Sequence, residues 1–597
     1  MIRRGPGPGF ARPKIRAKDT VGTLKRLVRY LDFAKRKLIL VFVLVLSTAL
    51  FAIIGPYLVV IAIDHYILPG NLRGLAFLTA GMIALYAVNA LFHWLQASLM
   101  VELAQTTVGR IRRELFAKIQ TLPLKFFDTS ERGDLMSRLT NDVDNISQIL
   151  TSSVTQVFNS LITLVGVLAM MLYLSPLLTL ANLAVIPVML LIVGKVASMS
   201  RNFFMQQQTA LGELNGFIEE TISGQKVVKV FTKEQTMLER FSTLNNNYRR
   251  SGIKAQILSG FIPPFMNILN NLNFAVIASL GGWLIVRGLS TIGVIGGFLN
   301  YSRQFTGPVM QLSNLFNMIQ AAIAGAERVF EVLDQEPEPE DAPDVKAPDR
   351  IDGEVQFEDV SFAYEKERPV LHGISLEAKP GQVIALVGPT GAGKTTIINL
   401  LTRFYDIDQG RITIDGLDIR QIKRDRLRSL LGVVLQDTYL FSASVKENIR
   451  YGRLDATDAE VEQAAKLANA HSFIIRLPNG YDTILSEDGS NLSQGQRQLL
   501  AIARAILADP AILILDEATS SVDTRTEQQI QSAMLELMKG RTSFVIAHRL
   551  STIRNADLIV VIDQGRIVEQ GKHQELLERK GFYYNLYMSQ FSLPLSS

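Results

Sequence analysis

The stretch "GQVIALVGPTGAGKTTIINLL", residues 381–401, decides the fold of the second half of this chain. Its apolar run at 383–387 predicts a buried strand, and the residues from Lys394 onward predict a helix. The glycine-rich turn between them can direct its backbone N–H groups, together with the start of the helix, at a phosphate. Short β-branched runs alternate with helical patterns from residue 351 onward, which predicts an α/β domain with a largely parallel sheet.

The residues of this turn have distinct expected roles at a bound nucleotide. Lys394 is expected to reach the terminal phosphates, and the Thr395 hydroxyl is expected to ligate Mg²⁺. The other positions expected to contact the nucleotide here are Gly388, Thr390, Gly391, Gly393 and Thr396. The alternative is an ordinary glycine-rich turn, and it is disfavoured because a buried strand precedes the turn and a helix follows it.

A second apolar run, "AILILDEATSSVD" at 511–523, ends in Asp516 and Glu517. An acid at the end of a buried strand can hold Mg²⁺ through water, and a second acid beside it can orient or deprotonate an attacking water. The alternative is that both acids only start the next helix, where negative charge is favourable. Because the same domain contains the predicted phosphate-binding turn, we favour a role for both acids in phosphoryl transfer.

Long uncharged stretches precede residue 340, at 38–63, 74–101, 145–194, 255–286 and 288–326, the last broken only by Arg303. A membrane-spanning helix needs about 20 apolar residues. The third stretch is long enough for two helices and is divided at Pro176. We therefore expect six spans within 38–326.

Basic residues predict the orientation of these spans. Segment 1–37, expected to include an interfacial helix, and the long loops 102–144 and 195–254 carry twelve, seven and nine Lys or Arg, whereas each other connection carries one at most. By the positive-inside rule these segments and both termini are cytoplasmic, in a multi-pass protein of the cytoplasmic membrane. The acidic, proline-rich region within 327–350 predicts an extended linker to a nucleotide-binding domain at 351–590.

Composition excludes some classes of chemistry. The chain has no cysteine, which rules out disulfides, thiolate metal sites and thiol nucleophiles. Hydrophobic residues make up 48% of it, as expected for a membrane half joined to a water-soluble half. The net charge of +5 is small for 597 residues, and we expect no nucleic-acid partner.

Five motifs follow the six predicted spans in order: "GPTGAGKTT", "LQD", "NLSQGQRQ", "ILILDEATS" and "VIAHRLST". With these motifs the chain resembles an ATP-binding cassette (ABC) exporter of the half-transporter kind, from about residue 20 to 590. The resemblance implies a six-helix transmembrane domain fused to an α/β P-loop nucleotide-binding domain. It also implies an ATPase that uses ATP and Mg²⁺ to drive alternating access of the membrane domain.

The resemblance also implies roles for single residues. Tyr364 would stack on adenine, although an ordinary strand aromatic is the alternative. Gln436 would touch Mg²⁺ and the attacking water, so that Thr395, Gln436 and Asp516 form the metal set. His548 would lie near the γ-phosphate, and Glu517 would be the catalytic carboxylate. Phe126, Phe127 and Asp128 fall near a transverse helix of the first long loop that would dock on the cassette.

The segment "NLSQGQRQ", residues 491–498, permits two interpretations. Ser493 and Gln496 form the pattern of a capping box, which starts a helix. Ser493 and the N–H groups near Gly495 can also receive a γ-phosphate at a positive helix end. The resemblance implies the second role for the site of the opposite subunit, with Asp523 also binding nucleotide.

Three residues depart from the family pattern in this region, namely Gln494, Ser521 and Val522. They lie on surfaces that the resemblance assigns to a partner, while the motifs for this chain's own site fit well. We therefore favour a heterodimer of two half-transporters over a homodimer.

The cargo is the part that the sequence specifies least. Few ionisable groups occur in the spans, which disfavours a strongly charged substrate. Four asparagines of the fifth span, Asn267, Asn270, Asn271 and Asn273, either line a polar cavity or bond helices together. We predict export of hydrophobic or amphipathic small molecules of the multidrug type. The alternatives are a lipid flippase and an ATP-gated channel or regulatory membrane ATPase that does not pump.

Overall fold

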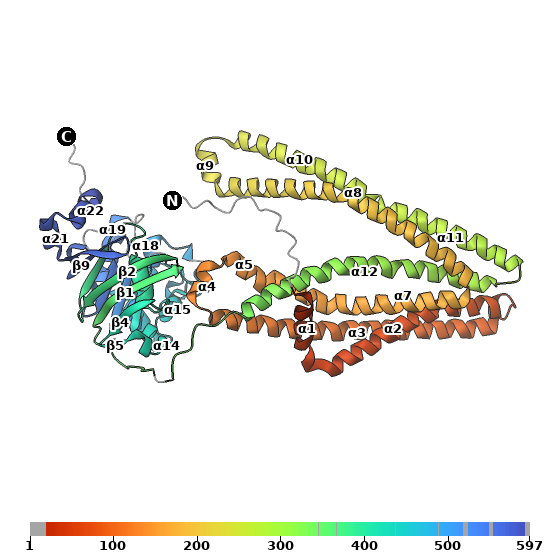
Figure 1. Ribbon diagram of the computed structural model, residues 1–597, viewed down its shortest axis with the longest axis horizontal. Coiled ribbons are helices and arrows are strands. Elements are labelled where there is room, and N and C mark those ends of the chain that lie inside the picture. Colours follow the sequence, from red (N-terminus) through yellow and green to blue (C-terminus); the bar gives the residue numbers. More distant parts are fainter. Residues whose placement is uncertain are drawn as a thin grey trace. The chain divides into compact units, whose positions relative to one another are not determined.

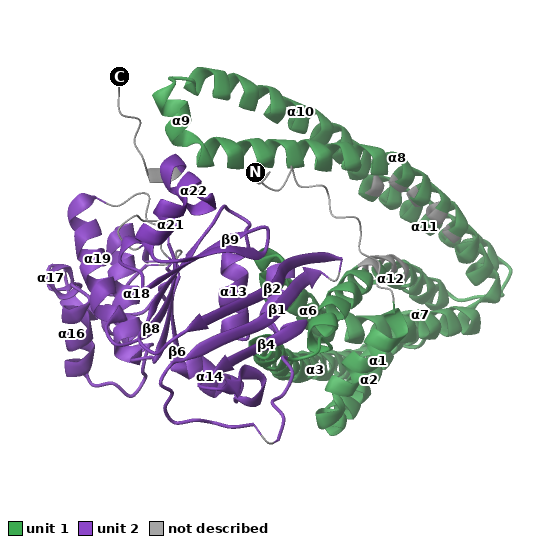
Figure 2. Ribbon diagram, turned by 60° about the vertical axis from the view of Figure 1, so that its left-hand side comes forward, with its two compact units in different colours: residues 1–122, 130–337 green, residues 123–129, 338–597 purple. Residues whose placement is uncertain are grey.

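The computed structural model describes residues 19–343, 345–365, 367–435, 438–486, 489–516, 523–547 and 553–591. The chain forms two compact units, shown in different colours in Figure 2. Unit 1 comprises Met1–Leu122 and Ser130–Pro337, and unit 2 comprises Pro123–Thr129 and Glu338–Ser597. The predicted catalytic residues Gln436, Glu517 and His548 lie outside the described residues.

Unit 1 is α-helical throughout its described residues. Its elements are α1 (Thr20–Tyr30), η1 (Asp32–Ala34), α2 (Lys35–Ile61), η2 (Ala62–Ile67), α3 (Leu72–Gln120), α5 (Arg132–Ser137), η3 (Arg138–Asp142), α6 (Val143–Gln148), η4 (Ile149–Ser153), α7 (Val154–Leu174), α8 (Pro176–Ser223), α9 (Gln225–Val230), α10 (Glu234–Gly260), α11 (Ile262–Val286) and α12 (Ile292–Leu333).

These helices are long because apolar spans continue into charged segments without a break. Helix α8 runs alongside α10 and α11 in a long hairpin, while α2 packs against α3, α7 and α12 (Figure 1). The predicted break at Pro176 is confirmed, since α7 ends at Leu174 and Pro176 opens α8. Proline suits the first turn of a helix because the backbone N–H that it lacks would have no partner within the helix at that position.

Four helical stretches of the described chain are long and apolar enough to cross a membrane. They are Asp32–Ile67, Leu72–Gln120, Arg132–Leu174 and Glu234–Val286. The remaining two predicted spans fall in α8 and α12, which are 48 and 42 residues long. The count of six spans stays a prediction.

Unit 2 contains two sheets. Its elements are α4 (Leu124–Thr129), β1 (Val355–Glu365), β2 (Arg368–Ala378), β3 (Val383–Val387), α13 (Lys394–Leu401), β4 (Gln409–Ile414), β5 (Leu417–Asp418), η5 (Ile419–Gln421), α14 (Arg424–Leu430), β6 (Leu431–Val434), α15 (Val445–Arg450), α16 (Asp458–Leu467), α17 (His471–Ile474), η6 (Gly480–Asp482), α18 (Gln494–Ala508), β7 (Ile512–Asp516), α19 (Thr524–Met538), β8 (Thr542–Ile546), β9 (Leu558–Asp563), β10 (Arg566–Gly571), α21 (His573–Arg579) and α22 (Phe582–Phe591).

The larger sheet has the strand order β10-β9-β3-β8-β7-β6. Strands β9, β3, β8, β7 and β6 run parallel, and β10 is antiparallel to β9. The predicted parallel sheet is therefore confirmed, and so is the buried strand at 383–387. A second sheet, with the antiparallel order β2-β1-β4-β5, was not predicted.

The two sheets share one hydrophobic core. Phe357 and Ile412 of the smaller sheet pack with Leu386 and Ile514 of the larger one, and with Ile397 of α13. The second core cluster of unit 2 lies among α15, α16, α18 and α19 and includes buried residues of β7 and β8. Ala385 and Val387 of β3 belong to a third cluster, with Ile559 and Val561 of β9. Strand β3 is thus packed on both faces and α13 is packed in the shared core, which holds the turn between them in place.

The acidic linker is bound along unit 2 from Glu338 onward. The Glu338 carboxylate accepts hydrogen bonds from the Arg428 guanidinium at 2.5 and 3.0 Å. Asp341 accepts a bond from the backbone N–H of Arg424 at 2.8 Å and pairs with Arg403. The acidic residues of the linker therefore supply partners for arginines of α14 and for Arg403, which follows α13.

Candidate functional site

The predicted phosphate-binding turn connects β3 to α13. A Cβ atom at Gly388 would lie 2.1 Å from the carbonyl oxygen of Ile562 in β9, so this position has no room for a side chain. Gly393 caps α13 with φ of 107°, a conformation that favours glycine. Thr390 and Gly391 form the exposed part of the turn. The turn is therefore a backbone cradle that fits a phosphate chain at a helix start.

Lys394 and Asp516 lie at the same edge of the sheet. The Lys394 side chain is 8% exposed, and its Nζ donates to the carbonyl oxygens of Gly388 and Pro389 at 2.8 and 2.9 Å. Burial lowers the pKa of the Lys394 ammonium, while the charge of Asp516 acts in the opposite direction. The predicted phosphate-binding cation and the predicted metal-binding carboxylate therefore interact.

The two threonines after Lys394 differ in environment. Thr395 is exposed in the first turn of α13, as a metal ligand requires. Thr396 is buried, and its Oγ1 accepts a hydrogen bond of 3.3 Å from the Tyr364 hydroxyl. The Tyr364 hydroxyl also accepts a bond from Asn399 Nδ2 at 3.2 Å. Tyr364 thus lies beside the phosphate-binding helix, and its stacking on adenine stays a prediction.

The three catalytic candidates outside the described residues follow neighbouring strands of one sheet. Strand β6 ends two residues before Gln436, β7 ends one residue before Glu517, and β8 ends two residues before His548. These strands are adjacent and parallel, so their carboxyl ends meet at the edge where β3 leads into the turn. The roles of these three residues stay predictions.

The capping box predicted at Ser493 is confirmed. The Ser493 Oγ accepts a bond from the Gln496 N–H at 3.3 Å, and Gln496 Oε1 accepts one from the Ser493 N–H at 2.9 Å. Gly495 is buried, whereas Gln494 is exposed. These contacts start α18, and the predicted role of this helix start at a partner's nucleotide stays a prediction.

Asp523 is the N-cap residue of α19, as Ser493 is of α18. Its Oδ2 accepts a bond of 3.0 Å from the Thr526 N–H. The bonds from Thr526 hold the pKa of this carboxyl below its usual value. Asp523 therefore caps a helix, and its contact with nucleotide stays a prediction.

Two of the histidines outside the motifs have structural partners. His471 Nδ1 lies 2.9 Å from the Tyr481 hydroxyl, and His573 Nδ1 lies 2.7 Å from the Tyr583 hydroxyl. Each of these two rings therefore has a tyrosine partner within unit 2.

Helix α4 of the first long loop belongs to unit 2. The Tyr405 hydroxyl donates a hydrogen bond of 2.5 Å to Asp128 Oδ2 on this helix. Burial raises the pKa of Tyr405, and the Asp128 carboxylate raises it further. Phe126 and Phe127 pack edge to face with ring centroids 5.6 Å apart. The predicted docking residue Asp128 thus has a defined contact on the nucleotide-binding unit.

Tyr405 is the functional candidate that the sequence analysis missed. Its ring packs edge to face on the ring of Tyr364, with centroids 4.9 Å apart. Tyr405 thereby connects the expected adenine-binding residue to α4. The available signal was an aromatic pair, Phe404 and Tyr405, shortly after the phosphate-binding helix.

We expect Tyr405→Phe to loosen α4 without disturbing the aromatic cluster. The ring stays, but one hydrogen bond to a carboxylate is lost, which is worth about 1.5 to 3 kcal/mol. Backbone amides of α4 should then exchange with solvent about tenfold faster or more in hydrogen-exchange mass spectrometry. Tyr481→Phe, which removes a hydroxyl bonded to His471, is the matched control and should leave α4 unchanged. Equal protection of α4 in wild type and Tyr405→Phe would contradict this prediction.

Comparisons with known proteins cover both halves of the chain. Residues 38–309 match the family of the ABC transporter transmembrane region, and residues 371–520 match the ABC transporter family. The chain is 50% identical over 581 residues to an uncharacterized ABC transporter ATP-binding protein of Bacillus subtilis, covering 97% of this chain and 96% of that protein.

Two further relatives carry substrate names. A fatty acid ABC transporter ATP-binding/permease protein of Mycobacterium bovis is 48% identical over 504 residues, which are 84% of this chain and 80% of that protein. An ATP-dependent lipid A-core flippase of Syntrophus aciditrophicus is 40% identical over 535 residues, which are 90% and 89% of the two chains.

A solved structure of a bacterial Atm1-family ABC exporter with ATP bound has a TM-score of 0.73 and 31% identity to this chain. The match covers 94% of this chain and 99% of that one. The phosphate-binding turn and these near full-length matches show that the chain belongs to the ABC transporter family, as a multi-pass membrane exporter that binds and hydrolyses ATP.

Proposed function

We propose that this chain is one subunit of an exporter that moves amphipathic lipids with a carboxylate head group, of the fatty-acid kind, across the cytoplasmic membrane. Both termini would lie on the cytoplasmic side. Two relatives are named for a fatty acid and for a lipid, which favours lipid cargo over the multidrug type. Export of drugs remains the second candidate.

The observation that carries this proposal is the position of Arg303 on α12. Its side chain is exposed, and its guanidinium carbon lies 5.8 Å from the ring centroid of Phe274 on α11. No carboxylate among the described residues pairs with it. A cation within a span costs at least about 2.5 kcal/mol, so such a residue commonly faces a substrate pathway. A guanidinium with free donors fits a carboxylate.

The asparagines of α11 extend this polar surface. Asn267, Asn270 and Asn271 share one helix face with Phe274 by their spacing, and all four side chains are exposed. Asn273 lies on another face and is buried, where its Nδ2 donates to Asn182 of α8 at 2.8 Å and to Ser302 of α12 at 2.9 Å. The bonding interpretation therefore applies to Asn273, and for its three neighbours we propose the other interpretation, a polar cavity lining.

Arg303→Gln should lower uptake of a labelled long-chain fatty acid into inside-out vesicles about tenfold, because one charge-assisted contact is lost. Arg303→Lys keeps the charge and should retain most of the uptake. Arg287→Gln is the matched control, since Arg287 also lies over an aromatic ring, that of Trp283, at 5.4 Å. Wild-type uptake by Arg303→Gln would contradict a carboxylate site at Arg303. If a neutral drug were carried equally by all variants while the fatty acid was not carried at all, the multidrug alternative would be supported.

For the ATP site we propose the roles assigned from sequence. Lys394 and the turn would hold the phosphates, and Thr395, Asp516 and Gln436 would hold Mg²⁺. The metal ion, when bound, neutralises charge on the phosphates. Glu517 would accept a proton from the attacking water, and His548 would contact the γ-phosphate side of the site.

The site also requires a second subunit. We propose that Ser493, Gly495, Gln496 and Asp523 face the nucleotide of a partner half-transporter, and that the partner is a different chain. Purification of this chain alone, followed by measurement of its mass and ATPase activity, distinguishes the two assemblies. A stable, highly active homodimer would contradict the heterodimer.

A further inference from the structure

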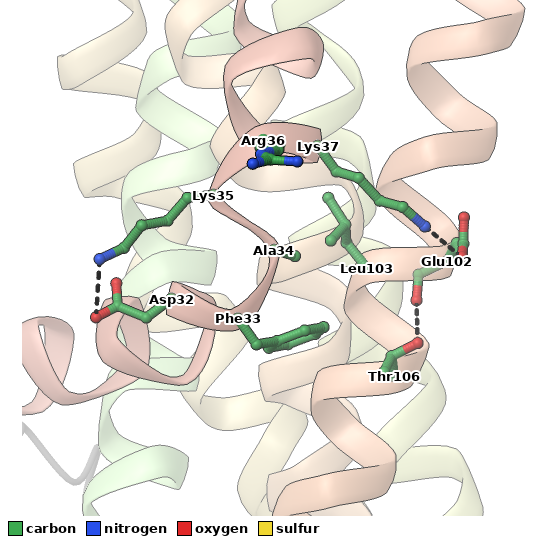
Figure 3. A pocket seen from close by; sticks show the side chains of 9 residues that line it. All are labelled: Asp32, Phe33, Ala34, Lys35, Arg36, Lys37, Glu102, Leu103 and Thr106. Atoms are coloured by element: carbon green, nitrogen blue, oxygen red, sulfur yellow. Dashed lines mark hydrogen bonds and ion pairs between the residues drawn. The ribbon is translucent and has the colours of Figure 1, made fainter.

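A cavity of about 570 Å³ lies where η1 and the start of α2 meet α3 (Figure 3). Three consecutive basic residues, Lys35, Arg36 and Lys37, line it, and the Lys35 side chain points toward Asp32 while the Lys37 side chain points toward Glu102 (Figure 3). Glu102 of α3 lies opposite, and the Phe33 ring, which is 53% exposed, lies at its edge. This basic pocket belongs entirely to unit 1 and is separate from the nucleotide site.

The charges of the basic pocket are only partly compensated. Lys37 Nζ lies 2.6 Å from Glu102 Oε1, and Lys35 Nζ lies 3.5 Å from Asp32 Oδ2. All four side chains are about half exposed or more, so these ion pairs are weak and can be exchanged for another anion. Arg36 has no carboxylate partner within the described chain, which leaves one uncompensated positive charge at the pocket.

Helix α1, just before the basic pocket, has the character of an interfacial helix. It is held to unit 1 by Arg26, whose guanidinium donates to Asp334 at 2.6 Å and lies 4.2 Å from the Phe330 ring centroid. Val21, Leu24 and Val28 form an apolar strip that is 76%, 47% and 55% exposed. An amphipathic helix with a free apolar strip and flanking basic residues lies in the membrane surface.

The start of α2 continues this surface into the membrane. Ile39, Phe42, Val43 and Leu46 recur at helical spacing, and all four are exposed. A strip of this kind faces lipid chains, since it directly follows the basic residues in a predicted span. A basic pocket above an apolar strip is complementary to a phosphate head group with acyl chains below it.

We propose that the basic pocket binds the head-group phosphate of an anionic phospholipid in the cytoplasmic leaflet. Arg36 and Lys35 contact the phosphate, and the acyl chains lie along the apolar strip of α2. The bound lipid anchors the junction of α1 and α2 at the membrane surface. This site does not depend on which cargo the exporter carries.

The test is native mass spectrometry of the full-length chain released from mixed micelles of phosphatidylglycerol and phosphatidylcholine. Wild type should retain phosphatidylglycerol in preference to phosphatidylcholine. Arg36→Ala and Lys35→Ala should each lower its retention about fivefold, the contribution of one cation near an anionic surface. Arg36→Lys keeps the charge and should retain the lipid. Arg113→Ala, which removes an exposed arginine of α3 outside the pocket, is the matched control.

Three results would overturn the proposal. The first is equal retention of both lipids by wild type, a comparison that needs no variant to fold. The second is an equal loss of phosphatidylglycerol in Arg113→Ala and Arg36→Ala. A third arm adds inorganic phosphate or glycerol phosphate at the concentration of the lipid. Displacement of the lipid by either ion at that concentration would show a free-phosphate site and contradict a membrane lipid as the occupant.

Discussion

Glu517→Gln is expected to keep ATP binding and to lower ATP hydrolysis about a thousandfold, within the range for loss of a general base. Glutamine has nearly the same shape as glutamate, but its amide cannot accept a proton from the attacking water. Strand β7 carries the chain to this position beside Asp516, at the edge of the sheet where Lys394 lies. Binding contacts should therefore persist while the chemical step fails.

The measurement for Glu517→Gln pairs phosphate release with nucleotide binding by isothermal calorimetry. Glu578→Gln, which changes an exposed carboxylate of α21, is the matched control and should hydrolyse ATP at the wild-type rate. If Glu517→Gln turned over ATP as wild type does, the catalytic base would have to be another residue. If it lost binding as well, Glu517 would be needed to form the site and not only for the chemical step.

Lys394→Met is expected to weaken ATP binding about a hundredfold, the scale of losing charged hydrogen bonds to phosphate. Methionine fills much of the space of the lysine chain, so the packing of this 8% exposed side chain is largely kept. Methionine cannot replace the two hydrogen bonds from Lys394 Nζ to the carbonyl oxygens of Gly388 and Pro389. Burial, which lowers the pKa of Lys394, also makes its charge unfavourable, and we expect the two effects to offset each other. The variant should therefore unfold at a temperature no lower than wild type.

A thermal unfolding curve and a nucleotide titration together check this prediction. Lys466→Met is the control, since Lys466 pairs with Glu462 on the surface of α16, outside the nucleotide site. Lower stability together with lost binding would indicate that Lys394 supports the fold of the turn. Unchanged binding would contradict a phosphate-binding role for this residue.

Structural elements that depend on residues close together in the sequence could be predicted. The strand at 383–387, the capping box at Ser493 and the helix break at Pro176 all depend on residues within a few positions of one another. Gln436 and His548, by contrast, were assigned only through the family resemblance of their motifs, and the roles of all three catalytic candidates stay predictions. The parallel sheet was readable because buried parallel strands are nearly continuous apolar runs.

Contacts between residues that are far apart in the sequence could not be predicted. Tyr405 and Asp128 are separated by 277 positions, and neither has a local pattern that names the other. The antiparallel sheet of β1, β2, β4 and β5 was missed because the sequence of each strand does not show which other strand it pairs with. Among the four asparagines of α11, Asn273 could be assigned a bonding role only once it was seen to contact α8 and α12.

We propose above all that hydrolysis of ATP by this chain drives export of a carboxylate-bearing lipid. The most direct test is ATP-dependent uptake of a labelled long-chain fatty acid into inside-out vesicles that contain the chain and its partner. Wild type should accumulate the label only with ATP and Mg²⁺, and vesicles with Glu517→Gln should show no more uptake than vesicles without ATP. Hydrolysis by wild type without accumulation, or equal accumulation in Glu517→Gln, would contradict the claim.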